Sequence, residues 1–140
     1  MKVKAKFTSV PKLGENLIKL YTEKNNNFDV MLGVEYVVYG VTTWKGVTHF
    51  LLKPENTYYE TYPNWYPIDL FEVTDTTISP FWVIGSNMLN EGGTIDIIMG
   101  YRLLVESLDH QDGIVLREKE HLTLFETAKK DIDELDSYGN

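Results

Sequence analysis

The chain has 140 residues, 43% hydrophobic and 24% charged, a composition typical of one folded domain covering residues 1–140. It contains no cysteine, which excludes a disulfide framework, a thiolate metal site and a cysteine nucleophile and accords with a cytoplasmic location. No apolar run approaches the ~20 residues that span a bilayer, so we expect no membrane partner.

The net charge of −8 is unevenly distributed along the chain. Residues 1–24 contain six lysines and two glutamates, whereas residues 106–140 contain ten acidic and four basic side chains. A negative surface repels phosphate backbones and attracts basic proteins, so nucleic acid is disfavoured as a partner and a basic protein is favoured. Solubility is the simpler alternative explanation for the acidity.

The first elements are short. Residues 2–7 alternate lysines with apolar side chains, which predicts an edge strand whose lysines face water. The apolar residues between Leu13 and Glu23 leave a short N-terminal helix open as an alternative. Five further strands are predicted at 34–41, 47–53, 68–74, 78–85 and 94–99, the first two forming a hairpin around Trp44–Gly46.

These strands place a β-rich core at about residues 30–100. Five short strands predict an SH3-like barrel or a curled antiparallel sheet, since either leaves few free edges. Beyond the core, apolar residues recur at steps of three or four, which predicts an amphipathic helix over about 114–136. The predicted class is therefore α+β. The helix stripe comprises Leu122, Phe125, Ala128, Ile132 and Leu135.

Residues able to perform covalent or metal chemistry are sparse. His49, His110 and His121 belong to no metal-binding motif, so we interpret them as partly exposed structural histidines. The five serines show no GxSxG, and phosphate-binding glycine loops are absent. We therefore expect no catalytic residue, no metal and no cofactor.

Carboxylates offer the one alternative chemistry. Asp69, Glu72 and Asp75 lie on or beside a predicted strand, but alternation places Asp69 and Glu72 on opposite faces. A solvated strand face explains them better than a pair acting as acid and base.

Aromatic side chains are concentrated between Tyr36 and Trp82, which hold twelve of the eighteen. Several fall in a predicted loop over 54–67, where Tyr58 and Tyr59 are typical of a hot spot for a protein partner. Trp65 and Tyr66 are expected to fold back as a lid on the core. For the loop as a whole, both a lid and a binding surface remain open.

The segments Val37–Val41, Trp65–Pro67 and Leu70–Val73 are followed by Asp75, Ile78–Ser79, Trp82 and Gly100–Tyr101. This VYG, WYP, LFE-D, S-W, GY layout resembles a group of small bacterial proteins, some of which are similar to immunity proteins of toxin systems. The resemblance implies a small cytoplasmic protein that neutralises a toxin by binding it. The matched positions are core and turn residues, with WYP as a turn, so no functional residue is carried over.

The leading prediction is a cytoplasmic protein-binding module, an immunity protein that blocks a basic toxin by occlusion. One alternative is a small regulatory or nucleic-acid-associated SH3-like module that uses the basic first 24 residues; another is an enzyme that uses carboxylates. The candidate partner-binding residues are exposed aromatic and acidic side chains: Tyr58, Tyr59, Asp109, Asp112, Glu118 and Glu120.

Overall fold

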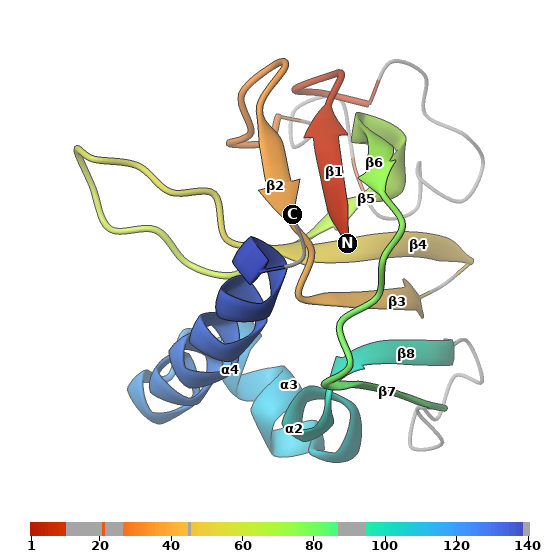
Figure 1. Cartoon of the computed structure of the whole chain (residues 1–140), viewed down its shortest axis with the longest axis vertical. Coiled ribbons are helices and arrows are strands. Elements are labelled where there is room, and N and C mark those ends of the chain that lie inside the picture. Colours follow the sequence, from red (N-terminus) through yellow and green to blue (C-terminus); the bar gives the residue numbers. More distant parts are fainter. Residues whose placement is uncertain (11–20, 22–26, 45, 87–94, 139–140) are drawn as a thin grey trace.

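The computed structural model describes residues 1–10, 21, 27–44, 46–86 and 95–138, so the alternative N-terminal helix lies outside the described residues. The described part forms two antiparallel sheets and three α-helices (Figure 1). The elements, in chain order, are β1 (Lys2–Ala5), β2 (Glu35–Val37), β3 (Gly40–Trp44), β4 (Val47–Leu52), β5 (Asn64–Pro67), the 3-10 helix η2 (Ile68–Leu70), β6 (Phe71–Asp75), β7 (Trp82–Gly85), β8 (Ile95–Tyr101), α2 (Arg102–Glu106), α3 (Leu108–Val115) and α4 (Lys119–Tyr138).

The smaller sheet has the order β2-β1-β6. Its alternating strand β1 was predicted at an edge, but it is the central strand, because Val3 pairs with Tyr36 on one side and Val73 on the other. Val3 and Ala5 are buried, whereas Lys2 and Lys4 point to the half-exposed face. The alternation predicted the faces of the strand correctly, because an antiparallel sheet can keep one face in water.

The larger sheet has the order β5-β4-β3-β8-β7. The predicted hairpin is confirmed as β3 and β4, with Val41 opposite Phe50. The segment Trp65–Pro67 is not a turn or part of a loop, because it lies in β5, where Tyr66 pairs with Phe50. Proline is tolerated there because β5 is an edge strand and Pro67 is its last residue.

The sheets do not close into a barrel, so the SH3-like prediction is wrong, whereas the α+β class and the C-terminal helix are confirmed. The predicted strand over 34–41 divides where the chain passes between the sheets. The Val38 N–H donates to the Met1 carbonyl at 3.0 Å, and the Tyr39 N–H donates to the Leu51 carbonyl at 2.9 Å. The predicted strand over 68–74 divides as well, into η2 and β6, and β6 joins the smaller sheet.

Two facing glycines allow α2 to approach the larger sheet closely. Gly40 and Gly100 are cross-strand partners in β3 and β8. A Cβ at either position would lie 2.6 or 2.7 Å from Cδ2 of Leu104, which is fully buried on α2. Gly100 also has a φ of +156°, a conformation that glycine adopts without strain. The pair of glycines therefore provides the space that Leu104 fills.

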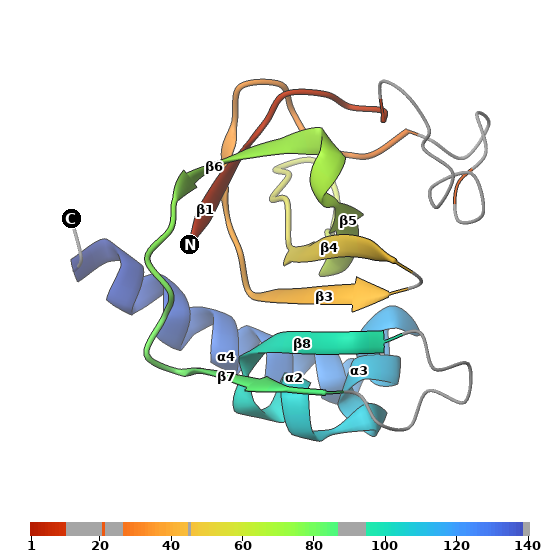
Figure 2. The ribbon, with the colours of Figure 1, turned by 90° about the vertical axis from the view of Figure 1, so that its right-hand side faces the viewer.

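Helix α4 starts five residues later than predicted, because α3 and a short junction occupy residues 108–118. The Ser107 side chain begins α3 by accepting the His110 N–H at 3.1 Å, the usual role of serine at an N-cap. Figure 2 shows α4 running from α3 past the larger sheet toward β1. The predicted stripe is confirmed at Phe125 and Ile132, which are buried against the sheet and the other helices.

The core has two hydrophobic clusters. One fills the space between the two sheets, and the other lies between the larger sheet and the helices. Trp82 packs against both clusters and so connects them. Among the described residues, none of the helices is long and apolar enough to cross a membrane.

Candidate functional site

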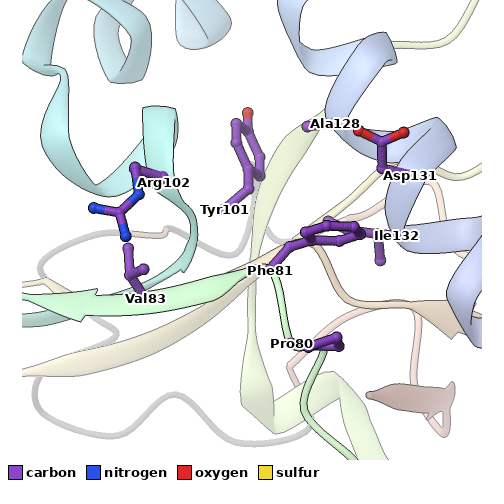
Figure 3. Close-up of a pocket in the computed structure, with 8 residues that line it drawn as sticks. All are labelled: Pro80, Phe81, Val83, Tyr101, Arg102, Ala128, Asp131 and Ile132. Carbon is purple, nitrogen blue, oxygen red and sulfur yellow. The ribbon is translucent and has the colours of Figure 1, made fainter.

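A first hollow of about 360 Å³ lies between β7, the start of α2 and α4. Figure 3 shows Arg102 and Asp131 on opposite sides of Phe81 and Tyr101. Arg102 already pairs with Glu106 at 2.6 Å. The two charges therefore do not converge on a common point, and this hollow offers no reactive arrangement.

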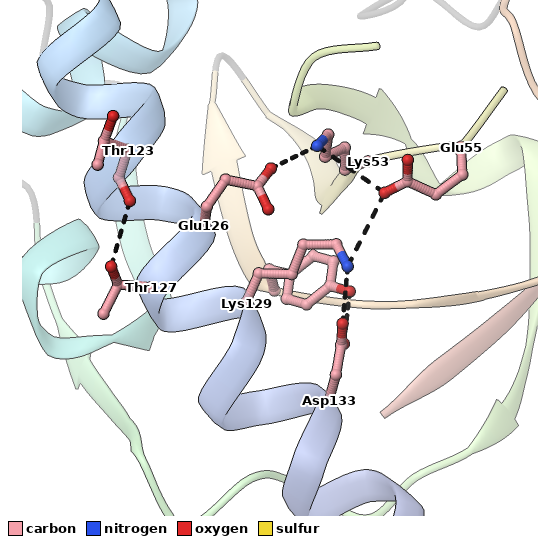
Figure 4. A network of polar contacts seen from close by, with 8 residues as sticks. Lys53, Glu55, Thr123, Glu126, Thr127, Lys129 and Asp133 are labelled. Carbon is pink, nitrogen blue, oxygen red and sulfur yellow. Dashed lines mark hydrogen bonds and ion pairs between the residues drawn. The ribbon is translucent and has the colours of Figure 1, made fainter. Parts of the chain in front are cut away.

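A polar network connects α4 with the sheets (Figure 4). Lys53, beyond the end of β4, pairs with Glu126 and lies 3.8 Å from Glu55. Lys129 lies 3.8 Å from Glu55 and 2.7 Å from Asp133. The partner of Glu126 is thus Lys53, which belongs to the segment after β4 and not to the helix. Each carboxylate here faces a lysine, so the network docks the helix and leaves no carboxylate pair poised for acid–base chemistry.

Tyr39 extends this network into the core. Its hydroxyl donates to Oδ1 of Asp133 at 2.6 Å, and its ring packs edge-on against Phe125. Replacing Tyr39 with phenylalanine is expected to lower the free energy of unfolding by about 2 kcal/mol, because a charge-assisted hydrogen bond is lost. Urea denaturation measures the change. Tyr58→Phe is the matched control and should change stability by less than about 0.5 kcal/mol, because that ring is 93% exposed. Equal effects of the two changes would contradict the assigned role of Tyr39.

The other candidate carboxylates lie apart from one another and in water. Asp69 is exposed on η2, and Glu72 is exposed on β6, where it lies 3.6 Å from Lys6. Asp75 accepts the Thr77 N–H at 2.8 Å, and this hydrogen bond holds the pKa of its carboxyl below the usual value. The interpretation as a solvated strand face agrees with the position of Glu72, whereas Asp69 lies on η2 and not on a strand.

The histidines differ from expectation. His49 and His110 are almost fully buried, at 2% and 0% exposure, and not partly exposed. His110 and His121, which are eleven residues apart, meet with their Nδ1 atoms 3.0 Å apart. Nothing in the spacing of the two residues predicted this contact, because it depends on how α3 packs on α4. Within the described ranges, no group of three or more His, Asp or Glu side chains could hold a metal ion.

The long connection between β4 and β5 brings the exposed tyrosines to the helices. It projects from the sheets on the side where α4 lies (Figure 1). Tyr59 and Tyr62 line a hollow of about 380 Å³ together with Lys119 and Leu122 of α4. The Arg117 guanidinium lies 4.2 Å from the centre of the Tyr62 ring, a cation–π contact that joins this loop to the junction between α3 and α4.

The junction itself is held by its backbone. Arg117 has a φ of 58°, and its N–H donates to the Ile114 carbonyl at 3.1 Å. The Glu118 N–H donates to the Gly113 carbonyl at 2.9 Å, which turns the chain into α4. This tight turn leaves Val115 and Leu116 61% and 68% exposed, although both are large apolar residues. Exposed apolar side chains beside acidic ones are typical of a protein-binding surface.

We call this region the loop–helix face; it consists of Tyr58, Tyr59, Tyr62, Val115, Leu116, Arg117, Glu118 and Glu120. Four of the predicted residues, Tyr58, Tyr59, Glu118 and Glu120, belong to this set, and all of them are exposed. Within the connecting loop, residues 57–60 are exposed, whereas Tyr66 is buried in β5.

The two remaining predicted residues lie on α3. Asp109 and Asp112 are both exposed, and Asp112 lines a separate cavity between α3 and the larger sheet. The exposure of Val115, Leu116 and Arg117 at a turn was not predicted, because the predicted helix over 114–136 included them. Comparison with protein-family models, with curated proteins and with solved structures finds no match for the chain.

Proposed function

We propose that this chain is a cytoplasmic protein-binding module that docks a basic protein on the loop–helix face, and that it acts as an immunity protein that neutralises a toxin by occlusion. The observation that supports the proposal most is the contact between Tyr62 and Arg117, which holds a tyrosine-rich loop against the junction between α3 and α4. Aromatic side chains supply large contact areas at little cost in conformational entropy.

Charge supports a basic partner. The chain carries a net charge of −8, although at the loop–helix face Glu118 and Glu120 alternate with Arg117 and Lys119, so the support comes from the charge of the whole chain. Opposite charge accelerates encounter and orients the partner before the apolar centre is buried. Val115 and Leu116 would then form the desolvated part of the interface, with the carboxylates at its rim.

Two of the three described lysines of the N-terminal segment, Lys2 and Lys6, do not favour the nucleic-acid alternative. Lys2 lies 3.1 Å from Asp136, and Lys6 lies 3.6 Å from Glu72. Because carboxylates already partner these cations, a phosphate backbone would have to displace them.

The experiment is affinity capture from an extract of the source organism, followed by kinetics with the purified partner. Tyr59→Ala is expected to raise Kd by about 10-fold or more, as truncation of an interface tyrosine typically does. Glu118→Gln is expected to lower the association rate constant and to reduce its dependence on salt.

Glu72→Gln is the matched control, because it removes the same charge from the smaller sheet, away from the loop–helix face. It should leave the affinity unchanged. A captured partner that binds the Tyr59→Ala and Glu118→Gln variants as tightly as the wild type would contradict the proposal. Capture of nucleic acid in place of a protein would contradict it as well.

A further inference from the structure

The cavity that Asp112 lines has about 440 Å³ of space and lies between α3 and one face of the larger sheet. Strands β3, β4 and β5 contribute Trp44, His49 and Trp65 to its walls. Helix α3 contributes the opposite wall, consisting of Leu108, Gln111, Asp112 and Val115. The cavity therefore has an aromatic floor and a carboxylate on its helical side.

The aromatic floor is fixed in place. The His49 ring lies between Tyr21 and Trp44, with ring centres 6.2 and 6.4 Å away. His49 Nδ1 lies 3.1 Å from the Val47 carbonyl and therefore donates to it, so Nε2 accepts from the Tyr21 hydroxyl at 3.0 Å. Burial lowers the pKa of His49, so the ring is neutral at neutral pH and adds no positive charge to the cavity.

The electrostatics of the cavity favour a cation. Trp44 and Trp65 present aromatic rings to it, and the faces of such rings attract positive charge. Asp112 adds a carboxylate, and none of the described residues that line the cavity is a lysine or an arginine. A cation that enters would therefore find an opposite charge and aromatic surface, without a competing positive group among the described lining residues.

We propose that this cavity binds an arginine side chain of the basic protein partner. A guanidinium is planar, weakly hydrated and able to stack on an aromatic ring while it pairs with a carboxylate, which suits a site with two tryptophans and Asp112. Val115 belongs both to the cavity wall and to the loop–helix face, so one partner can contact both. This inference rests on the proposed function, because it names the group by which the partner is recognised.

The test needs no partner. The unmodified chain is titrated with N-acetyl-arginine amide at neutral pH while NMR follows the three tryptophan indole N–H signals. Saturable shifts are expected for Trp44 and Trp65. Trp82 is the internal reference, because it packs in the core clusters and should not respond. N-acetyl-citrulline amide, which has nearly the same shape without the charge, is expected to bind at least about 5-fold more weakly.

Two variants locate the binding. Asp112→Asn is expected to raise the Kd of the arginine probe by about 3- to 5-fold, whereas Asp109→Asn, which removes an exposed aspartate from the same helix, should leave it unchanged. Equal binding of the citrulline probe, equal effects of the two variants, or no saturable shift would each overturn the inference.

The two proposals fail separately. If the arginine probe does not bind while the Tyr59→Ala variant still loses a captured partner, the cavity assignment is wrong and the protein-binding function stands. If the probe binds as described but variants of the loop–helix face bind the partner normally, the proposed docking face is wrong.

Discussion

Replacing Gly113 with alanine is expected to destabilise the fold by about 3 kcal/mol, because the new methyl group would overlap the side chain of His121. A Cβ on Gly113 would lie 2.1 Å from Cδ2 and 2.3 Å from Cγ of that ring. The ring has little freedom to move away. Its Nδ1 lies 3.0 Å from Nδ1 of the fully buried His110, so a displacement would break that hydrogen bond. Urea denaturation measures the loss.

The matched experiment reverses the sign of the effect. A His121→Ala background removes the imidazole ring that the new methyl group would overlap. Gly113 itself lies within α3. Glycine in a helix interior is about 1 kcal/mol less favourable than alanine, so Gly113→Ala should now stabilise the chain by about that amount. The four proteins form a double-mutant cycle with a coupling energy of about 4 kcal/mol, the difference between the two effects. Equal destabilisation in both backgrounds would show that His121 does not restrict position 113.

The spacing of apolar residues predicted the buried face of an element where that face depends only on the element's own sequence. The alternation in Lys2–Ala5 marks the buried face of β1, and the spacing of Phe125 and Ile132 marks the buried stripe of α4. The hairpin of β3 and β4 was predictable because its strands are close in sequence. These features depend on periodicity and short connections, both of which a sequence displays directly.

Sheet membership could not be predicted in the same way. Nothing local distinguishes Val38, which pairs with Met1, from Tyr39, which pairs with Leu51, yet the chain changes sheets between them. A run of β-forming residues specifies an extended conformation but not its partner strand. The predicted barrel combined strands that belong to two different sheets, and for that reason the barrel does not form.

The candidate site likewise has some features that the sequence predicted and others that it did not. Exposure of Tyr58, Tyr59 and Glu118 could be predicted from residue type and from a loop or helix context. Their placement on one face depends on the contact between Arg117 and Tyr62, which are 55 positions apart in the sequence. The cavity beside Asp112 was equally hidden, because its walls come from α3 and four separate strands, β3, β4, β5 and β8.

The chain is expected to lose about 3 kcal/mol of stability as the pH falls from 6.5 toward 4, owing to the burial of His110. Burial lowers the pKa of His110 to about 4, from 6.5 in the unfolded chain, and the neighbouring His121 is the smaller cause. Below pH 6.5, therefore, His110 binds a proton in the unfolded chain but not in the folded chain. Each pKa unit of this difference is worth about 1.4 kcal/mol, and the stability is fully present only above pH 6.5.

The hydrogen bonds around His110 favour the neutral form of its ring in the folded chain. Tyr101 places its hydroxyl 2.6 Å from Nε2, and His121 Nδ1 lies 3.0 Å from the Nδ1 atom. A neutral ring satisfies both contacts, accepting from the tyrosine and donating to His121. A charged ring would have to donate at both nitrogens, which removes the acceptor of the buried Tyr101 hydroxyl.

His110→Gln isolates this contribution, because glutamine does not titrate. Burial also lowers the pKa of His49, so this residue too makes the fold less stable as the pH falls below 6.5. Because His49 is present in both proteins, its effect cancels in the comparison. The difference in unfolding free energy between wild type and variant should therefore shift by about 3 kcal/mol against the wild type as the pH falls from 7.5 to 4. NMR titration of the imidazole signals should place His110 near 4. Parallel stability curves, or a His110 that titrates near 6.5, would mean that the folded chain admits the proton into this contact between α3 and α4.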